Sequence, residues 1–201
     1  MHIKPNLFAH KAPLPQLPTR VSGTEEEEKI QAIVSYTTTL ELLSKTVNPN
    51  SYLLDIGTGS GYYTACLAHL VGSSGHVVSI DKRKDNLVEA KENIKASYPE
   101  LLERISFIEA DALKFNYEKQ FDAIHSGVAV PFVPPNWLSL LTIGGGMTLP
   151  LIIHKKGIQE SKLQQTPQQT LYYITKNPDG KCKLIQLYDV DYVVIEQDNK
   201  I

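Results

Sequence analysis

The segment at residues 53–72, LLDIGTGSGYYTACLAHLVG, constrains the fold of this chain more than any other. An apolar run typical of a buried strand is followed by three closely spaced glycines and then by an apolar helical pattern. Glycine suits such a turn because it adopts positive φ angles and lets another group approach the backbone. The segment therefore predicts a strand, a tight turn and a helix, which together form the first unit of an α/β sheet.

Strand and helix patterns continue to alternate after this unit. The strand-like runs are at 52–56, 76–81, 104–111, 121–127 and 147–153, and the helical runs are at 61–72, 84–98 and 136–142. We expect Gly144, Gly145 and Gly146 to end the last helix, because glycine is a poor helix former. The alternation predicts a parallel sheet with helices on both faces.

The C-terminal part has a different pattern. Residues 169–176 and 183–197 are strand-like and are separated by the turn sequence NPDG, whereas residues 155–168 are polar and predict a loop. Consecutive strands joined by a tight turn pair antiparallel. The sequence therefore predicts a parallel sheet that is closed by a C-terminal antiparallel hairpin.

The N-terminal part divides into an arm and a helix. Residues 1–23 contain four prolines and are expected to form an extended arm. A helix is expected over residues 24–47, because Thr24 suits the N-cap position and the glutamates at 25–28 suit the positive end of the helix dipole. Residues 24–201 are long enough for a single domain with a substantial core.

Composition excludes several classes of partner. A net charge of −2 gives no general reason to expect nucleic acid or an anionic membrane surface, and no apolar run is long enough to span a bilayer. The two cysteines, Cys66 and Cys182, are too few for a disulfide framework or a metal site. We expect an intracellular protein, cytoplasmic by default, with a mitochondrial location as the alternative because the N-terminal stretch is basic.

The spacing of the glycines bears on the ligand. Gly57, Gly59 and Gly61 form the pattern G-x-G-x-G. A dinucleotide-binding turn has its third glycine one position later, where this chain carries Tyr62. The spacing therefore argues against NAD and favours a ligand without a pyrophosphate group.

Three aspartates lie in phase with this turn. Asp81 ends the second predicted strand 22 positions after Gly59, which is the spacing of a carboxylate that binds ribose hydroxyls. Asp111 follows the third strand, where its loop can reach an adenine edge. Asp55 precedes the first glycine and either faces the ligand or braces its own loop. Each acid alone is also compatible with a capping or surface role, but the three together favour a nucleoside site.

More specific segments follow the same order along the chain: DIGTGSGYYTACLA, SIDK, IEADA, FDAIHSGVAVPFVPP and GGGMTLPL. They resemble the protein-L-isoaspartate O-methyltransferase family, which uses S-adenosylmethionine, and the likeness extends from about residue 31 to about residue 196. The resemblance implies a Rossmann-like, seven-stranded methyltransferase sheet, mostly parallel with a reversed C-terminal strand. The cofactor-binding residues that it implies are Asp55, Gly57, Thr58, Gly59, Ser60 and Gly61 around the methionine part, Asp81 and Lys82 at the ribose, and Asp111 and Ala112 near the adenine.

The resemblance also points to a substrate segment before the first strand. In the family this segment reads Thr-Ile-Ser and then Ala-Pro-His-Met-His-Ala, and its serine helps to position the isoaspartyl carboxylate. The comparable segment here is QAIVSYTTTLELL, in which Ser35 matches the serine while residues 36–39 (YTTT) lack the Pro-His-Met-His run. Ser35 is therefore the candidate catalytic residue, with a plain helix-surface serine as its alternative. His125 is expected to be structural, and Val130 and Pro131 are expected to border the substrate cleft.

Two classes of function remain open from the sequence. The first is a carboxyl O-methyltransferase that acts on isoaspartyl residues of damaged proteins or peptides, or, with a rebuilt substrate segment, on another acceptor. The second is a catalytically inactive subunit of a larger assembly, in which the arm at residues 1–23 docks against neighbouring subunits. Methylation of nucleic-acid bases has no support, since no Asp/Asn-Pro-Pro-aromatic motif follows the fourth strand.

Overall fold

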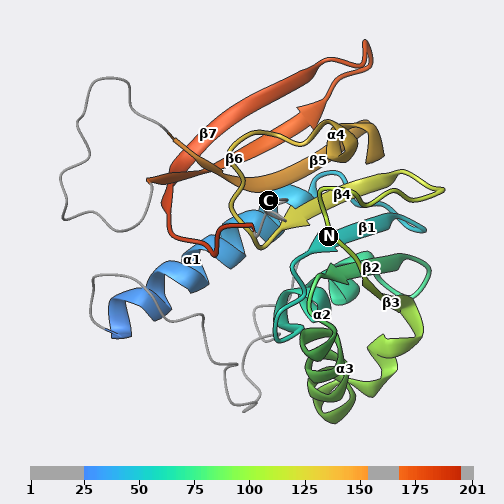
Figure 1. The fold of residues 1–201 in the computed structure, drawn as a ribbon. Coiled ribbons are helices and arrows are strands. Elements are labelled where there is room, and N and C mark those ends of the chain that lie inside the picture. Colours follow the sequence, from blue (N-terminus) through green and yellow to red (C-terminus); the bar gives the residue numbers. More distant parts are fainter. Residues whose placement is uncertain (1–24, 154–167, 196–201) are drawn as a thin grey trace, which may run out of the picture.

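The computed structural model describes the backbone of residues 25–153 and 168–195, with side chains from residue 34 onward (Figure 1). The arm predicted at residues 1–23 and nearly all of the loop predicted at residues 155–168 lie outside the described residues. The division of the chain into an arm and a single domain therefore stays a prediction.

Within the described residues, one seven-stranded sheet organises the fold, with the strand order β3-β2-β1-β4-β5-β6-β7. The strands are β1 Tyr52–Ile56, β2 His76–Asp81, β3 Ile105–Glu109, β4 Phe121–Ser126, β5 Leu141–Ile152, β6 Gln169–Lys176 and β7 Cys182–Val190. Strands β1 to β5 are parallel, and β6 is antiparallel to both β5 and β7. The predicted α/β sheet with a C-terminal hairpin is confirmed, and the reversed strand is β6.

Helices cover both faces of the sheet, unequally. They are α1 Glu25–Ser44, α2 Tyr62–Val71, α3 Lys84–Ser97, the 3-10 helix η2 Pro99–Arg104 and α4 Pro135–Leu140. Neighbouring strand residues point to opposite faces. Leu53 accordingly packs with α1, α2 and α3, whereas Leu54 packs with Trp137 of α4 and with Phe115. Among the described residues, the second face is thus covered by α4 and the loop that contains Phe115.

The predicted boundary between α4 and β5 was wrong. The helix ends at Leu140, and β5 begins at Leu141 and continues through the three glycines. Register with β4 passes from Phe121↔Leu141 to Ala123↔Gly146, so residues 142–145 form a bulge. A Cβ on Gly146 would lie 2.7 Å from the hydroxyl of Tyr173. The glycines therefore allow a bulged strand to pack closely and do not serve only to end a helix.

The strand predicted at residues 183–197 is also interrupted. β7 ends at Val190, and residues 191–195, which we call the C-terminal strap, cross to the segment that follows β4. The N–H of Ala129 donates to Val193 O at 2.8 Å, and the N–H of Ile195 donates to Ala129 O at 2.9 Å. The strap therefore lies at the carboxyl ends of the parallel strands, where ligands bind in sheets of this kind.

Candidate cofactor and substrate site

The glycine turn lies between β1 and α2 and is docked onto the end of β2. The N–H of Gly57 donates to Ile80 O at 2.8 Å, and the N–H of Thr58 donates to the same oxygen at 3.2 Å. The φ angles of Gly57, Gly59 and Gly61 are 85°, 51° and 82°. Side chains with a Cβ rarely adopt such angles, so the turn requires glycine at all three positions.

The three glycines nevertheless differ in what surrounds them. A Cβ on Gly57 would lie 3.1 Å from Val128 Cγ1, and a Cβ on Gly61 would lie 2.7 Å from Ala90 Cβ. A Cβ on Gly59 would meet only Gly57 O, at 4.0 Å. Gly57 and Gly61 are therefore required by packing within the protein, whereas Gly59 faces open space in which a ligand can approach the backbone.

Asp81, the last residue of β2, lies directly at this turn. Its Oδ2 accepts hydrogen bonds from the Gly59 N–H and the Asn86 Nδ2, both at 3.1 Å, and its Oδ1 accepts one from the Arg83 N–H at 2.9 Å. A carboxylate offers about four acceptor positions, so Oδ1 retains capacity for a ligand hydroxyl. The neighbouring Lys82 is exposed, and Ser60 is held through its carbonyl oxygen by Asn93 of α3.

Asp55 has a different environment. Its side chain is completely buried, with Oδ2 accepting from Thr64 Oγ1 at 2.6 Å and Oδ1 accepting from His125 Nδ1 at 2.8 Å. Ser79 Oγ continues the network, at 2.9 Å from Thr64 Oγ1 and 2.7 Å from Thr58 Oγ1. The sequence left open whether Asp55 faces the ligand or braces its own loop. The geometry favours the second role, in which the carboxylate supports the glycine turn from inside the protein.

His125 lies in the core beside Asp55, as expected for a structural residue. It is the register partner of Asp55 on β4, and its ring stacks on Tyr63 of α2 with centroids 3.6 Å apart. Its Nε2 has no hydrogen-bond partner among the described residues, and neither has the hydroxyl of its register partner on β5, Thr148. Val130 is also buried, at 0% exposure, and Ser35 is similarly buried at 4%, so neither side chain is open to solvent in this structure. The roles expected for them beside a substrate stay predictions.

The loop after β3 is held from the opposite face of the sheet. Asp111 Oδ1 accepts from the Leu113 N–H at 3.0 Å, and Ala112 O accepts from Trp137 Nε1 at 2.8 Å and from Asn136 Nδ2 at 3.2 Å. Sequence reasoning missed both residues of α4. The available signal was the only tryptophan of the chain, at the start of a short helix.

Ser35, the candidate substrate residue, is 4% exposed, and its Oγ lies 2.6 Å from the phenolic oxygen of Tyr192 in the C-terminal strap. The carbonyl oxygen of Ser35 accepts from Thr39 Oγ1 at 2.9 Å, which in turn accepts from the hydroxyl of Tyr63 at 2.7 Å. The ring of Tyr36 lies 5.5 Å from that of Tyr63. The YTTT segment is therefore packed and hydrogen-bonded to the residues that surround Asp55.

Several tyrosines and one thiol near the site retain their protons at neutral pH. Burial, as the main cause, raises the pKa of Tyr62 to about 12 and the pKa of Cys66 to about 12. Burial also raises the pKa of Tyr36, Tyr63 and Tyr192. These groups consequently remain protonated and are not anionic bases or nucleophiles at neutral pH.

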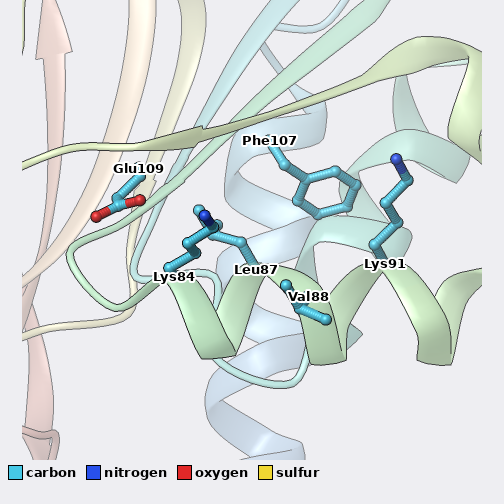
Figure 2. A pocket seen from close by; sticks show the side chains of 6 residues that line it. All are labelled: Lys84, Leu87, Val88, Lys91, Phe107 and Glu109. Carbon is cyan, nitrogen blue, oxygen red and sulfur yellow. The ribbon is translucent and has the colours of Figure 1, made fainter.

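A cavity lies away from the residues that the sequence predicted for cofactor and substrate. This cavity of about 260 Å³ lies between α3 and β3, and the side chains that line it are shown in Figure 2: Lys84, Leu87, Val88, Lys91, Phe107 and Glu109. None of them belongs to the predicted cofactor or substrate residues. Among the described residues, no group of three potential metal ligands occurs and no helix is long and apolar enough to cross a membrane.

Several known proteins are similar to this chain in sequence. Relatives named protein-L-isoaspartate O-methyltransferase include one from Triticum aestivum, 34% identical over 168 residues and covering 82% of this chain and 67% of the relative. Another, from Caenorhabditis elegans, is 33% identical over 147 residues, covering 72% of this chain and 64% of the relative. A third relative, from Arabidopsis thaliana, is matched over 50% of its own length. The chain therefore spans about half to two thirds of the length of these relatives.

A solved structure shares both the fold and the sequence pattern. It is assigned to protein-L-isoaspartate O-methyltransferase of Plasmodium falciparum in complex with S-adenosyl-L-homocysteine, with a TM-score of 0.68 and 28% identity, covering 81% of this chain and 73% of that one. The family model described as Protein-L-isoaspartate(D-aspartate) O-methyltransferase (PCMT) matches residues 5–200. This chain therefore belongs to the protein-L-isoaspartate O-methyltransferase family.

Proposed function

We propose that this protein transfers a methyl group from S-adenosylmethionine to the carboxylate of isoaspartyl residues in proteins or peptides. The observation that carries the proposal is the turn at Gly59, whose open side lies beside the Asp81 carboxylate at the end of β2. The match of the family model over residues 5–200 and the relative crystallised with S-adenosyl-L-homocysteine support the same assignment.

The residues present suit this cofactor. Asp81 would accept from the ribose hydroxyls, the backbone at Gly59 would lie against the methionine part, and the Asp111–Ala112 loop would border the adenine. The cofactor, when bound, supplies a methyl group that is already activated by the sulfonium charge. The work left to Asp55, Gly57, Thr58, Ser60 and Gly61 is to shape and brace the turn, which orients the ligand. The exposed Lys82 would lie beside the ribose, next to Asp81.

Ser35 is the proposed contact to the substrate. A carboxylate is its own nucleophile, so the protein needs a hydrogen-bond donor to orient it and no general base. This requirement agrees with the raised pKa values of the surrounding phenols. Rate acceleration then depends on alignment of the carboxylate and on exclusion of water. Exposed apolar side chains at Phe132 and Val193 offer a surface for the flanking peptide.

The direct test is incubation with labelled S-adenosylmethionine and an isoaspartyl peptide, with the same peptide carrying ordinary aspartate as the control. We expect a base-labile methyl ester on the isoaspartyl peptide alone. Calorimetric titration with S-adenosyl-L-homocysteine should be run in parallel. Binding without ester on either peptide would reject isoaspartyl methylation, and absence of both binding and ester would favour the inactive structural subunit.

A further inference from the structure

The hydroxyl of Ser35 has a partner 157 residues away in the sequence. Its Oγ lies 2.6 Å from the phenolic oxygen of Tyr192, and either atom can be the donor. Ser35 lies on α1 and is almost completely buried, whereas Tyr192 belongs to the C-terminal strap. The strap therefore brings a second hydroxyl to the residue that we assign to the substrate carboxylate.

Tyr192 is held in place by its own backbone. Its N–H donates to Gln169 Oε1 at 2.7 Å, and its carbonyl oxygen accepts from Gln169 Nε2 at 2.8 Å. The next residues of the strap are fixed by the two hydrogen bonds to Ala129. Gln169 is buried and opens strand β6, so the position of the phenol is set by the sheet.

The chemistry of the two hydroxyls favours one direction for their hydrogen bond. A phenol is a stronger donor than an aliphatic alcohol, and burial raises the pKa of Tyr192, so the phenol keeps its proton. When Tyr192 donates to Ser35 Oγ, the single proton of the serine is available to another acceptor. Hydrogen bonds in such a chain strengthen one another.

We propose that Tyr192 is a positioning residue, whose O–H donates to Ser35 Oγ and thereby directs the Ser35 O–H toward the isoaspartyl carboxylate. The inference rests on the proposed function. It adds to that function a role for the C-terminal strap, which contributes to substrate affinity through Ser35 without contacting the cofactor.

The test compares Tyr192→Phe with Tyr188→Phe in the full-length chain. Both changes remove one phenolic oxygen, but the hydroxyl of Tyr188 is buried and has no partner among the described residues. We expect Tyr192→Phe to raise the KM for an isoaspartyl peptide about tenfold, as for loss of a hydrogen bond that supports a charged group. Because alignment of the carboxylate also sets the rate, its kcat should fall as well, and the lost buried hydrogen bond should lower its Tm slightly. Its affinity for S-adenosyl-L-homocysteine should match that of the wild type, and Tyr188→Phe should leave KM, kcat and this affinity unchanged.

A double-mutant cycle with Ser35→Ala separates positioning from a purely structural role. If Tyr192 acts through Ser35, Tyr192→Phe has no further effect on KM in the Ser35→Ala background. The inference is overturned if the wild type is active and Tyr192→Phe behaves like Tyr188→Phe, lowers Tm and cofactor affinity together, or raises KM equally in both backgrounds. A wild-type chain that forms no ester would overturn the proposed function and this inference together, so the two failures are distinguishable.

Discussion

Asp55 and Asp81 are both carboxylates near the carboxyl end of a strand, yet their surroundings give them different roles. Asp55 points to the face that α1 and α2 cover, where its side chain is fully buried and accepts hydrogen bonds from Thr64 and His125. Asp81 is the last residue of β2 and is 9% exposed, with backbone N–H groups around it. One position braces the turn, and the other remains accessible to a ligand.

Replacing Asp81 should therefore weaken cofactor binding more than it weakens the fold. Asp81→Ala removes a charged acceptor worth about 1.5–3 kcal/mol, so the affinity for S-adenosyl-L-homocysteine should fall about ten- to a hundredfold in a calorimetric titration. Asp85→Ala is the matched control, because Asp85 is exposed in the first turn of α3. Equal affinities for the two variants would contradict a ligand role for Asp81.

At the level of elements, the start of α2 is pressed against α3. The Cβ of Ala90 on α3 would lie 2.7 Å from a Cβ at position 61, and its Cα would lie 2.9 Å away. The contact keeps the glycine turn at a constant distance from α3, whose Asn86 and Asn93 bond Asp81 and Ser60. The geometry of the turn is thus supported by helix packing as well as by its own φ angles.

Gly61→Ala should accordingly destabilise the fold more than glycine replacement at an open position. The positive φ costs about 1–2 kcal/mol, and the clash with α3 adds about 1–3 kcal/mol. Gly180→Ala is the control, since its φ is 79° and its Cβ would meet nothing within 4 Å. Urea denaturation measures the free energy of unfolding of each variant. Equal decreases for Gly61→Ala and Gly180→Ala would show that α3 moves to accommodate the new methyl group.

The short helix α4 holds the loop that carries Asp111 from the other face of the sheet. Asn136 Nδ2 donates to Ala112 O at 3.2 Å and to Phe115 O at 3.0 Å, which ties the loop after β3 to α4. A six-residue helix would contribute little alone, but here its side chains satisfy carbonyl groups of a loop that has no regular structure.

Asn136→Ala should therefore loosen the loop that carries Asp111. We expect the affinity for S-adenosyl-L-homocysteine to fall roughly threefold to tenfold, in line with the loss of one or two neutral hydrogen bonds. Asn116→Ala serves as the control, because Asn116 is exposed and bonds the backbone of its neighbour Tyr117. If both variants bind S-adenosyl-L-homocysteine with wild-type affinity, α4 does not contribute to ligand binding.

At the scale of the whole molecule, a chain of buried hydrogen bonds and one ring stack joins distant parts of the sequence. It runs from Tyr192 in the strap through Ser35 and Thr39 to Tyr63, whose ring lies on His125, and so to Asp55. The polar groups are compatible with a buried position because nearly all of them are paired. These contacts link Ser35, the candidate substrate residue, to the aspartate that braces the glycine turn.

Burial of Cys66 and Tyr62 on α2 makes the fold sensitive to alkali. The folded state raises the pKa of the Cys66 thiol from 9.0 to about 12 and that of Tyr62 from 10.0 to about 12. When the pH exceeds the pKa of the group in the unfolded chain, the unfolded chain has released a proton that the folded chain retains. The free energy of unfolding therefore falls as pH rises from about 9 toward 12. Urea midpoints between pH 8 and pH 11 should fall less steeply for Cys66→Ala, and identical slopes would exclude a contribution from the thiol.

The residue pattern along the chain predicted most helices and strands. It failed at two places where the same pattern is compatible with two different structures. The run at residues 144–146 was expected to end a helix, but it forms a bulged strand because Tyr173 packs against Gly146. The run at 183–197 was expected to be one strand, but the chain leaves the sheet at Val190 to pair with Ala129. In both cases a contact with a distant segment overrides the local preference.

The sequence by itself determined the order of strands and helices, the turn that only glycine can form and the acids that follow each strand. All of these depend on residues close together in the chain, where periodicity and backbone sterics apply. Only the tertiary structure decided that Asp55 faces inward to His125, that Asn136 holds the loop at Ala112 and that Tyr192 meets Ser35. These pairs are separated by 70, 24 and 157 residues, and hydrogen bonds between such distant groups leave no period in the sequence.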